Sequence, residues 1–435
     1  MKILIITSSN PLKAAGIVAF DLYKGLNSLG GMEVKILVRE WDRYNDNNII
    51  PYENRFTAFK RKIYYSILSF LKKWKVLKNS AILTNLDYFF LDYDQTVTYN
   101  STEAILNKVD FKPDAVVVLF MQYFLSFKNL YEINKLTQAP ILLYLMDMVN
   151  ITGGCHYAWD CKSYLNSCGN CPALFSNNKN DQSFINFNYK KNYIEKSSIL
   201  PIVCTEWQFI QLSKSSLFTN KSVHKVLLGI DDQLFKPGNK NEAKNFFHLP
   251  QDKKIIFFGA VFFDRFRNKG FKELIQALSI VKNDFSNSSN IHLAIAGNST
   301  IELSECLPFK YTFLGYLNHE ELAEAFRAAD LFVSPSIEDS GPMMINQSIM
   351  SGTPVVAFEM GVAIDLVVSG ETGYKAKLND CKDLANGIMN VLNLKDSEYL
   401  NMSNKCRELG LQLCHTRVQS NQIMNIINLN TNKFV

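Results

Sequence analysis

Long apolar runs are missing from this sequence of 435 residues. No stretch approaches the roughly eighteen consecutive apolar residues that a membrane-spanning helix requires. The first residues, MKILIITSSN, contain an apolar run of only four residues, which is too short for a signal peptide. We therefore expect a cytoplasmic protein, and in that reducing compartment the nine cysteines are expected as free thiols or metal ligands rather than disulfides.

Signatures of several other chemistries are also missing. The sequence has no P-loop and no GxSxG motif, which argues against a nucleoside triphosphatase or a serine hydrolase. Asp92 and Asp94 have the spacing of a metal-binding DxD pair, but they fall in a polar loop region and we treat the match as chance. The formal net charge of +5 is modest and does not indicate a nucleic-acid partner.

The chain does contain a regular alternation of strand and helix patterns. With 47% hydrophobic and 20% charged residues it is typical of a globular protein, and its length allows two or three domains. Short buried-strand runs alternate with helical patterns in the first half, and the alternation restarts near residue 254. This pattern predicts an α/β chain with two doubly wound, Rossmann-like parallel-sheet domains. We expect the domains at residues 1–224 and 225–410, with a final helix in 411–435 that returns to the first domain; the last helical pattern runs roughly from 396 to 428.

The most informative stretch is DLFVSPSIEDSGPMMINQSIMSGTPVVAF, residues 330–358. It predicts a strand, a loop, a helix of about ten residues that begins at Pro342, and a second strand. Glu338, Asp339, Ser340 and Gly341 then lie at the carboxyl end of a strand and the amino end of a helix, with Pro342 as the next residue of the expected donor-binding turn. In open parallel sheets this is where ligands bind, and free backbone N–H groups there favour anions. A carboxylate beside such a turn suits a ligand with both hydroxyl and phosphate groups.

This stretch resembles the donor-binding signature of retaining GT-B glycosyltransferases of the group 1 class, family 4. In that signature one Glu is followed, after seven residues, by a second Glu; here Glu338 matches the first and Asn346 stands in place of the second. The resemblance implies two domains that face each other across a cleft. It also implies that Glu338 contacts the donor sugar and that residue 346 holds the nucleotide ribose, where Asn346 offers an uncharged hydrogen-bonding group.

Other expected donor-side residues follow from the same comparison. The loop FFDRFRNKGF carries Arg265, Arg267 and Lys269 at the mouth of a parallel sheet, where cations would stabilise a leaving diphosphate. Lys269 best matches the family's Lys before Gly, with Arg265 as its catalytic partner and Arg267 as a donor-binding residue; a solvated basic loop is the alternative. Gly297 ends a strand near the expected base or ribose. Gly16 opens the first helix, either as a donor-binding glycine or as an ordinary helix-entry glycine.

On the acceptor side, Asp147 follows a buried strand. Many family members place a His immediately before this Asp to contact the donor sugar, but here Met146 occupies that position. His156, in the following loop, is a candidate to supply the missing polar group; the alternative is that no residue replaces it.

The segment TGGCHYAWDCKSYLNSCGNCP, residues 152–172, is an insert in the first domain. Its cysteines, Cys155, Cys161, Cys168 and Cys171, fall within seventeen positions and end in a CxxC. Such close spacing suits a structural zinc. Free thiols and disulfides remain the alternatives, and the block is similar to one in a bacterial subset of family 4.

Residues 55–78 form a basic segment without a single Asp or Glu. Apolar residues recur at three- and four-residue intervals along it, which predicts a helix with one apolar face and lysines around it. Such a helix suits an anionic membrane surface; the alternative is a helix packed on the sheet with a solvated basic edge.

Together these features predict a glycosyltransferase that transfers a sugar from a UDP- or GDP-sugar to a glycan or lipid-linked acceptor. The resemblance implies retention of configuration and no metal or other cofactor in catalysis. The enzyme class and the basic segment 55–78 together favour a role in bacterial surface polysaccharide synthesis, at the inner face of the membrane. The alternative is a catalytically weakened GT-B protein that binds a sugar nucleotide or glycan, because Met146 and Asn346 replace residues that relatives use. An epimerase acting on a UDP-sugar fits poorly with six histidines.

Overall fold

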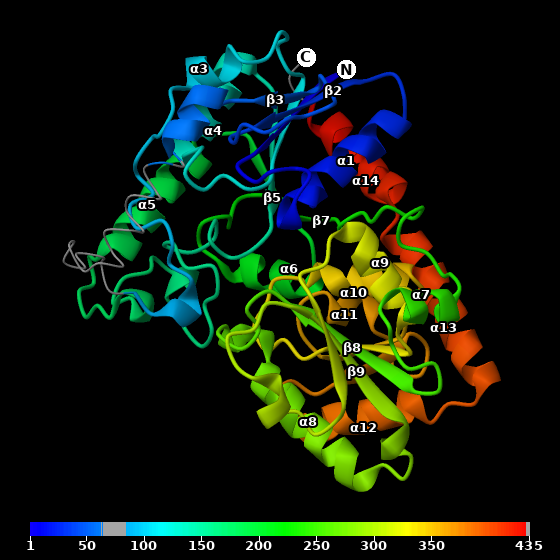
Figure 1. Cartoon of the computed structure of the whole chain (residues 1–435). Helices are drawn as coiled ribbons and strands as arrows, with labels where there is room; N and C mark the ends of the chain where they lie inside the picture. The colour runs from blue at the N-terminus through cyan, green and yellow to red at the C-terminus, as the bar shows by residue number, and fades with distance from the viewer. Residues whose placement is uncertain (62, 64–83, 432–435) are drawn as a thin grey trace. The chain divides into compact units, whose positions relative to one another are not determined.

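The computed structural model describes residues 1–61, 63 and 84–431, and these form two compact α/β units (Figure 1). Unit 1 comprises residues 1–203, 209–226 and the chain from Ser420 onward. Unit 2 comprises residues 204–208 and 227–419. The boundary expected between residues 224 and 225 thus falls between 226 and 227, and the return to unit 1 occurs at Ser420 rather than at 411.

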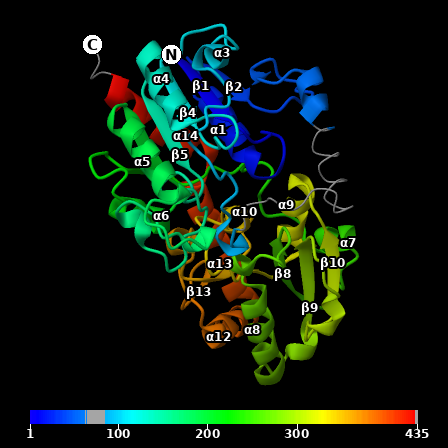
Figure 2. The same ribbon diagram turned by 90° about the vertical axis from the view of Figure 1, so that its left-hand side faces the viewer.

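The centre of unit 1 is a parallel sheet of seven strands in the order β3-β2-β1-β4-β5-β6-β7 (Figure 2). In chain order the strands are β1 Lys2–Thr7, β2 Glu33–Val38, β3 Ile49–Pro51, β4 Ala115–Val118, β5 Ile141–Leu145, β6 Ile199–Val203 and β7 His224–Lys225. Ile5 of β1 lies opposite Ile36 of β2 and Val117 of β4. These strands read as short apolar runs because both faces of a parallel sheet are covered.

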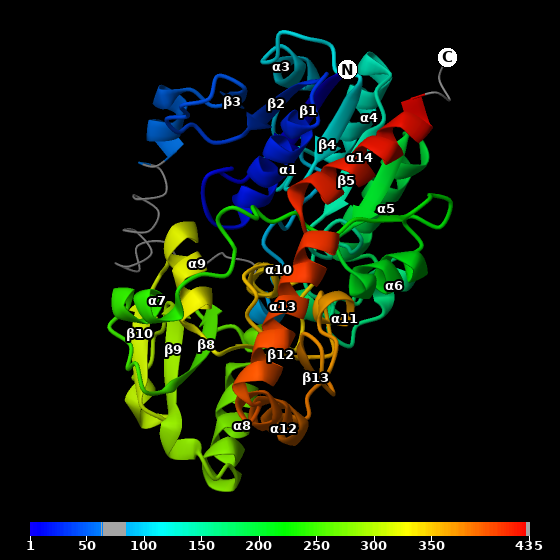
Figure 3. The ribbon, with the colours of Figure 1, turned by 90° about the vertical axis from the view of Figure 1, so that its right-hand side faces the viewer.

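Helices cover the sheet of unit 1. Its helices include α1 Ile17–Ser28, α3 Thr102–Leu106, α4 Phe127–Thr137 and α5 Gln182–Glu195. Helix α6, Glu206–Lys214, is divided, since its first three residues belong to unit 2 and the others to unit 1. Leu4 and Val116 of the sheet share a buried cluster with Ile133 of α4 and Phe187 of α5. The end of α14 (Thr416–Thr431) and α1 lie side by side in Figures 1 and 3.

Unit 2 has its own parallel sheet, with six strands in the order β10-β9-β8-β11-β12-β13. The strands are β8 Lys254–Ala260, β9 Ile291–Gly297, β10 Tyr311–Gly315, β11 Leu331–Ser334, β12 Val355–Phe358 and β13 Gly373–Ala376. The helices are α7 Lys240–Phe246, α8 Phe271–Asp284, α9 His319–Ala328, α10 Met343–Met350, α11 Ala363–Leu366, α12 Cys381–Leu392 and α13 Asp396–Leu413.

Successive residues of β8 show how the two faces of this sheet are filled. Phe257 packs edge to face on Phe326 of α9, with ring centroids 5.3 Å apart. Its neighbour Phe258 points to the opposite face, as strand geometry requires, and stacks on Phe271 of α8 at 6.0 Å. Since α12 packs on α8, these two helices cover one face, while α7 and α9 pack together on the other.

The single helical pattern expected over 396–428 is two helices in the structure. The first, α13, ends at Leu413, and α14 begins at Thr416. The backbone N–H of Ile230 donates a 2.7 Å hydrogen bond to the carbonyl oxygen of Cys414, and Ile230 also forms a β-bridge with His415. In a continuous helix the Cys414 carbonyl oxygen would accept a hydrogen bond from the next turn of the same helix. Here it accepts one from Ile230, in a distant segment of the chain.

In the part of the chain that the structure describes, every helix is too short or too polar to cross a bilayer. Most of the basic segment 55–78 lies outside the described residues, which include only 55–61 and 63 of it.

Candidate functional site

The carboxyl ends of β8 and β11 mark the point where the strand order of unit 2 reverses. From β8 the chain proceeds to β9 and β10 on one side of the sheet, and from β11 it proceeds to β12 and β13 on the other. Ligands in open parallel sheets bind outside such a switch point. The loop after β8 carries Lys269 and the loop after β11 carries Glu338, so the topology brings these two predicted residues to the same edge of the sheet.

Backbone contacts hold the two loops together. The N–H of Ile337 donates a 3.0 Å hydrogen bond to the carbonyl oxygen of Asn268. Gly270 has a φ of +67°, and a Cβ at this position would lie 1.7 Å from the carbonyl oxygen of Pro335. Both the conformation and the close approach require glycine. Lys269, immediately before it, is therefore fixed against the loop that carries Glu338.

An ion pair joins the two loops at the side-chain level. The Lys269 ammonium lies 2.7 Å from Oδ2 of Asp339, and the backbone N–H of Gly341 donates a 3.2 Å hydrogen bond to Oδ1 of the same carboxylate. Glu338 is only 8% exposed. The site thus combines a buried carboxylate with a cation and a backbone donor, the combination that a ligand with hydroxyl and phosphate groups requires.

The two arginines of the loop after β8 are exposed. Arg265 places its guanidinium over the ring of Phe262, 5.8 Å from the centroid. Among the described residues no hydrogen bond joins the Arg265 side chain to Lys269 or to Asp339. The catalytic role of Arg265 and the donor-binding role of Arg267 stay predictions.

The turn before α10 is held by a residue from far upstream in the chain. The Thr205 hydroxyl donates a 2.7 Å hydrogen bond to the carbonyl oxygen of Ser340, and a Cβ on Gly341 would lie 2.9 Å from Cγ2 of Thr205. Pro342 is the N-cap residue of α10 rather than its first residue, and the helix has 8 residues where about ten were expected. The turn is therefore tight and partly buried, and Thr205, a residue far from it in the sequence, fixes its position.

Asn346, the residue in place of the family's second Glu, is 2% exposed. Its amide nitrogen lies 3.5 Å from the Cys414 sulfur, at the end of α13. Burial raises the pKa of this thiol to about 12, so it faces Asn346 as a neutral group. A neutral amide suits this position better than a carboxylate would, because an unpaired buried charge is costly. Whether Asn346 reaches a ribose stays a prediction.

Gly297 and Gly16, two of the predicted donor-binding glycines, have packing roles. A Cβ on Gly297 would lie 1.9 Å from the carbonyl oxygen of Ala260 on the neighbouring strand, and one on Gly16 would lie 1.9 Å from the carbonyl oxygen of Asn10. Gly297 also has a φ of +121°. Close packing therefore accounts for glycine at both positions, and contact with a donor stays a prediction.

In unit 1, the predicted acceptor-side residues form a hydrogen-bonded pair. Asp147 follows β5, and its Oδ2 lies 2.8 Å from Nδ1 of His156. Burial acts to raise the pKa of Asp147, but attraction to His156 and their hydrogen bond outweigh it, so the pKa is below its usual value. The other ring nitrogen of His156, Nε2, is buried and has no hydrogen-bond partner among the described residues. The contact with Asp147 therefore fixes the orientation of the imidazole, and the second ring nitrogen is buried with its hydrogen-bonding capacity unused among the described residues.

The four cysteines of the insert lie near one another but do not form a ligand set. Burial raises the pKa of Cys155 to about 12, and the charges of Cys171 and Cys161 add to the effect. The ammonium of Lys190, which burial brings to a pKa of about 8, donates to the carbonyl oxygens of Val149 and Thr152. In the described ranges, no group of three or more His, Cys, Asp or Glu side chains is arranged to hold a metal ion. Structural zinc on Cys155, Cys161, Cys168 and Cys171 stays a prediction.

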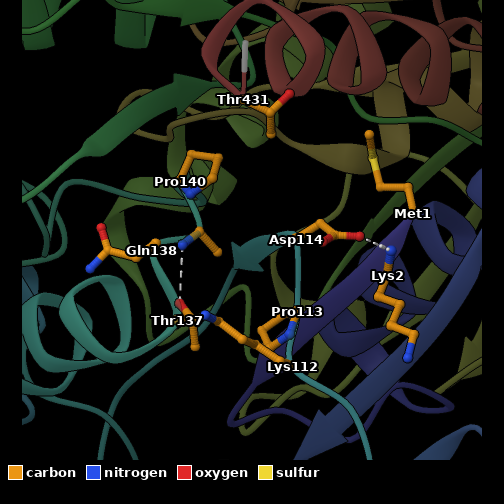
Figure 4. A pocket seen from close by; sticks show the side chains of 10 residues that line it. Met1, Lys2, Lys112, Pro113, Asp114, Thr137, Gln138, Pro140 and Thr431 are labelled. Atoms are coloured by element: carbon orange, nitrogen blue, oxygen red, sulfur yellow. Dashed lines mark hydrogen bonds between the residues drawn. The ribbon is translucent and has the colours of Figure 1, made fainter. Parts of the chain in front are cut away.

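A pocket of about 810 Å³ lies at the amino-terminal ends of the strands in the unit 1 sheet (Figure 4). Lys2 begins β1, Asp114 precedes β4 and Pro140 precedes β5, so the pocket adjoins the amino ends of these strands. The backbone N–H of Lys2 donates a 2.7 Å hydrogen bond to Asp114. Because ligands of parallel sheets bind at the carboxyl ends, this pocket is not our candidate site.

The sequence placed Asp339 in the expected ligand-binding crevice without a role of its own, and it did not identify Thr205 as a site residue. A local signal for Asp339 was present, because it is an acidic residue adjacent to Glu338, in a loop that was expected to lie near Lys269. Thr205 had no such signal, because its contact with Ser340 spans 135 positions of the chain.

Comparisons with known proteins point to one family and one fold. Residues 239–409 match the family model described as "Glycosyl transferases group 1". D-inositol 3-phosphate glycosyltransferase of Mycolicibacterium smegmatis is 28% identical over 203 residues, and that of Mycobacterium bovis is 27% identical over 178 residues. The first alignment covers 44% of both chains, and the second covers 38% of this chain and 35% of the relative. The chain thus spans less than half the length of these curated relatives.

Solved structures with similar folds cover nearly the whole chain. Sucrose-phosphate synthase from Thermosynechococcus elongatus has a TM-score of 0.66 and 16% identity, with 98% of each chain covered. Anabaena HepE in complex with UDP and glucose has a TM-score of 0.59 and 16% identity, with 99% of this chain and 100% of the other covered. WaaG, a glycosyltransferase involved in lipopolysaccharide biosynthesis, has a TM-score of 0.60 and 12% identity, with 98% and 99% covered.

The parallel-sheet units and these structural neighbours show that the chain has the GT-B fold, and residues 239–409, within unit 2, match the group 1 glycosyltransferase family.

Proposed function

We propose that this protein is a retaining glycosyltransferase that uses a nucleotide-diphosphate sugar. One observation carries the proposal: the switch point of the unit 2 sheet brings together Glu338, Lys269 and the N–H of Gly341, within the segment that matches the group 1 family. In this proposal Glu338 binds the hydroxyls of the donor sugar. Lys269 and the turn before α10 stabilise the charge that develops on the leaving diphosphate.

The donor is a UDP- or GDP-sugar in this proposal. Anabaena HepE, which shares the fold, has been solved with UDP and glucose. Cationic and backbone groups of the protein receive the diphosphate charge here, so we propose that transfer requires no metal ion. Activity in the presence of EDTA would test this part of the proposal.

The acceptor side of the proposal rests on His156 and Asp147. With Nδ1–H directed at the Asp147 carboxylate, Nε2 of a neutral imidazole is a hydrogen-bond acceptor. We propose that it binds a hydroxyl of a glycan or lipid-linked acceptor. A role in bacterial surface polysaccharide synthesis is supported by the fold shared with WaaG, which acts in lipopolysaccharide biosynthesis.

Membrane association is the last part of the proposal, and its support comes from the described start of the basic segment. Residues 55–61 and 63 are helical, and Phe56, Phe59 and Ile63 are 63%, 60% and 43% exposed. These three residues recur on one helix face, and Lys60 lies over the Phe56 ring at 4.4 Å. Exposed aromatic residues flanked by cations suit an anionic lipid surface at the inner face of the membrane.

The binding experiment compares UDP, GDP, ADP and CMP in thermal-shift measurements on the wild type, Lys269→Ala and the exposed control Lys272→Ala. A ligand at a hundredfold excess over its Kd adds about 2.7 kcal/mol of stability. We expect one nucleotide to stabilise the wild type and the control but not Lys269→Ala. Equal stabilisation of all three proteins would rule out the proposed donor site.

The transfer experiment uses the nucleotide-sugar identified in this way. Glu338→Gln should retain nucleotide binding but lose sugar transfer and sugar-nucleotide hydrolysis, whereas Glu408→Gln, an exposed change on α13, should retain both. The second candidate function, a protein that binds a sugar nucleotide without turnover, is favoured by the burial of Asn346 in place of a carboxylate. Tight nucleotide binding by the wild type without turnover on any acceptor would decide for it.

A further inference from the structure

The Asp339 carboxylate bonds to the same two groups that the proposed function assigns to the donor diphosphate. Its Oδ2 lies 2.7 Å from the Lys269 ammonium and its Oδ1 accepts a 3.2 Å hydrogen bond from the N–H of Gly341. Both oxygens of one carboxylate thus contact a cation and a backbone donor, in the way that two oxygens of a phosphate would. The side chain of Asp339 is 13% exposed and that of Lys269 is 27% exposed.

The loop is built so that this carboxylate stays in place. Gly270 fixes the backbone beside Lys269 against Pro335, and Thr205 fixes the backbone of Ser340, between Asp339 and Gly341. With the backbone held at both points, the exchange of one anion for another requires side-chain rotation only.

We infer that Asp339 is an internal competitor for the donor diphosphate, a positioning residue that acts through Lys269. The inference rests on the proposed function. In the ligand-free protein, Asp339 holds Lys269 and the Gly341 N–H in the arrangement that a diphosphate needs. A bound diphosphate replaces the carboxylate at Lys269, and a ligand with several anionic oxygens displaces a single carboxylate better than a monoanion does.

The same exchange has a consequence after sugar transfer. The nucleoside diphosphate product must leave Lys269, and the returning Asp339 carboxylate supplies a replacement anion within the loop. Asp339 therefore weakens diphosphate binding and speeds product release.

The test measures the Kd of inorganic pyrophosphate and of UDP by calorimetry on the wild type, Asp339→Asn, Asp339→Glu and Lys269→Met. We expect Asp339→Asn to bind pyrophosphate at least fivefold more tightly than the wild type, because the competing charge is gone. Asp339→Glu, which keeps the charge, should remain close to the wild type. In the Lys269→Met background the Asp339→Asn change should not alter the Kd of pyrophosphate, since there is no ammonium for which the carboxylate and the ligand compete. A merely structural role of Asp339 would not depend on Lys269 in this way.

With an active wild type, steady-state kinetics give a second measurement. Asp339→Asn should lower both KM for the nucleotide sugar and kcat, and the nucleoside diphosphate should become a stronger product inhibitor.

The possible outcomes distinguish a failure of this inference from a failure of the proposed function. Unchanged or weaker pyrophosphate binding by folded Asp339→Asn, with normal binding by the wild type, would overturn this inference alone. A wild type that binds neither pyrophosphate nor any nucleotide would overturn the proposed function as well. If neither Asp339→Asn nor Asp339→Ser folds, the carboxylate is required by the loop itself, and the inference is also overturned.

Discussion

The Thr205 hydroxyl donates a hydrogen bond of 2.7 Å to the carbonyl oxygen of Ser340, a residue 135 positions further along the chain. Thr205 is 1% exposed, and its oxygen also accepts a hydrogen bond from the N–H of Gln208. One buried hydroxyl thus caps the start of α6 and fixes the turn that carries the proposed diphosphate-binding N–H.

We predict that Thr205→Val destabilises the protein and weakens nucleotide binding. Valine has nearly the same shape but leaves the Ser340 carbonyl oxygen and the Gln208 N–H without their partner, at a cost of about 1–3 kcal/mol. Urea unfolding and the Kd of the preferred nucleotide check the two effects. Thr205→Ser retains the hydroxyl and should restore binding; a Thr205→Val variant with wild-type affinity would show that the turn holds its shape without this contact.

Gly270 and Gly315 offer a matched comparison of steric clash with backbone strain. Both have positive φ, +67° and +69°, but a Cβ at 270 would lie 1.7 Å from the Pro335 carbonyl oxygen, whereas a Cβ at 315 meets nothing within 4 Å. Gly315→Ala should cost only the left-handed conformation, about 1–2 kcal/mol. Gly270→Ala should cost more, because the loops after β8 and β11 must separate. Chemical denaturation of both variants is the measurement, and similar losses would contradict the close approach.

We predict that His156→Ala lowers sugar transfer to the acceptor by about 10²-fold or more, the range typical of a positioned proton acceptor. Nucleotide binding should not change, because the proposed diphosphate-binding groups, Lys269 and the Gly341 N–H, belong to unit 2 and His156 belongs to unit 1. His156→Gln and Asp147→Asn should give intermediate rates, since each retains a hydrogen-bonding group. Single-turnover transfer assays check the rates. Wild-type transfer by His156→Ala would exclude the proposed acceptor role.

The stability of the folded protein should fall as the pH rises above about 9, in part because of Cys155. Burial, with the nearby Cys171 and Cys161, raises the pKa of this thiol to about 12 from its ordinary value of 9.0. Between these two values the unfolded chain has released the proton and the folded protein retains it. The unfolded state then binds fewer protons, so unfolding becomes more favourable by about 1.4 kcal/mol per pH unit for this one group.

Urea unfolding between pH 8 and 11 measures this slope. Cys155→Ala should be flatter than the wild type by that amount, and Cys161→Ala, a change in the same insert, serves as the comparison. Elemental analysis of unchelated protein belongs to the same experiment, because a bound zinc would hold the thiols deprotonated and remove the expected slope. A wild-type slope in Cys155→Ala would show that this thiol ionises equally well in the folded and unfolded states.

Membrane association can be measured with vesicles of phosphatidylglycerol and of phosphatidylcholine at low salt. Substitution of both Phe56 and Phe59 by serine should reduce binding to the anionic vesicles severalfold, because both rings are exposed on the described helix. Phe246→Ser removes a ring that is 57% exposed in unit 2 and should have no effect. Equal binding of all variants would remove these rings from the interaction.

The strands could be predicted because the residue types in each run indicate whether the strand is buried. The runs at 331–333 and Val355–Phe358 are apolar throughout, which is typical of strands covered on both faces. Lys269 and Glu338 were identified by the resemblance to the group 1 family, and the parallel strands that precede them, β8 and β11, end at a common edge of the sheet. Local sequence was sufficient for these elements.

Other features depended on contacts between distant segments and left no local signal. The helical pattern around Cys414 contains no proline, and the hydrogen bond from the N–H of Ile230 to the Cys414 carbonyl oxygen lies where α13 ends. The burial of Asn346 follows from the position of Cys414, and the fixed turn at Ser340 follows from Thr205. The chemistry of the side chains identified the candidate residues, but contacts between distant segments determine the position of each one.

The unit that carries the proposed donor site is not one contiguous segment of the chain. Here residues 204–208 belong to unit 2 although residues of unit 1 flank them in the chain, and the last residues belong to unit 1. A graft of 227–419 alone would combine the new donor loops with a foreign partner for Ser340. A successful chimera must therefore carry the short segment around Thr205 along with its donor domain.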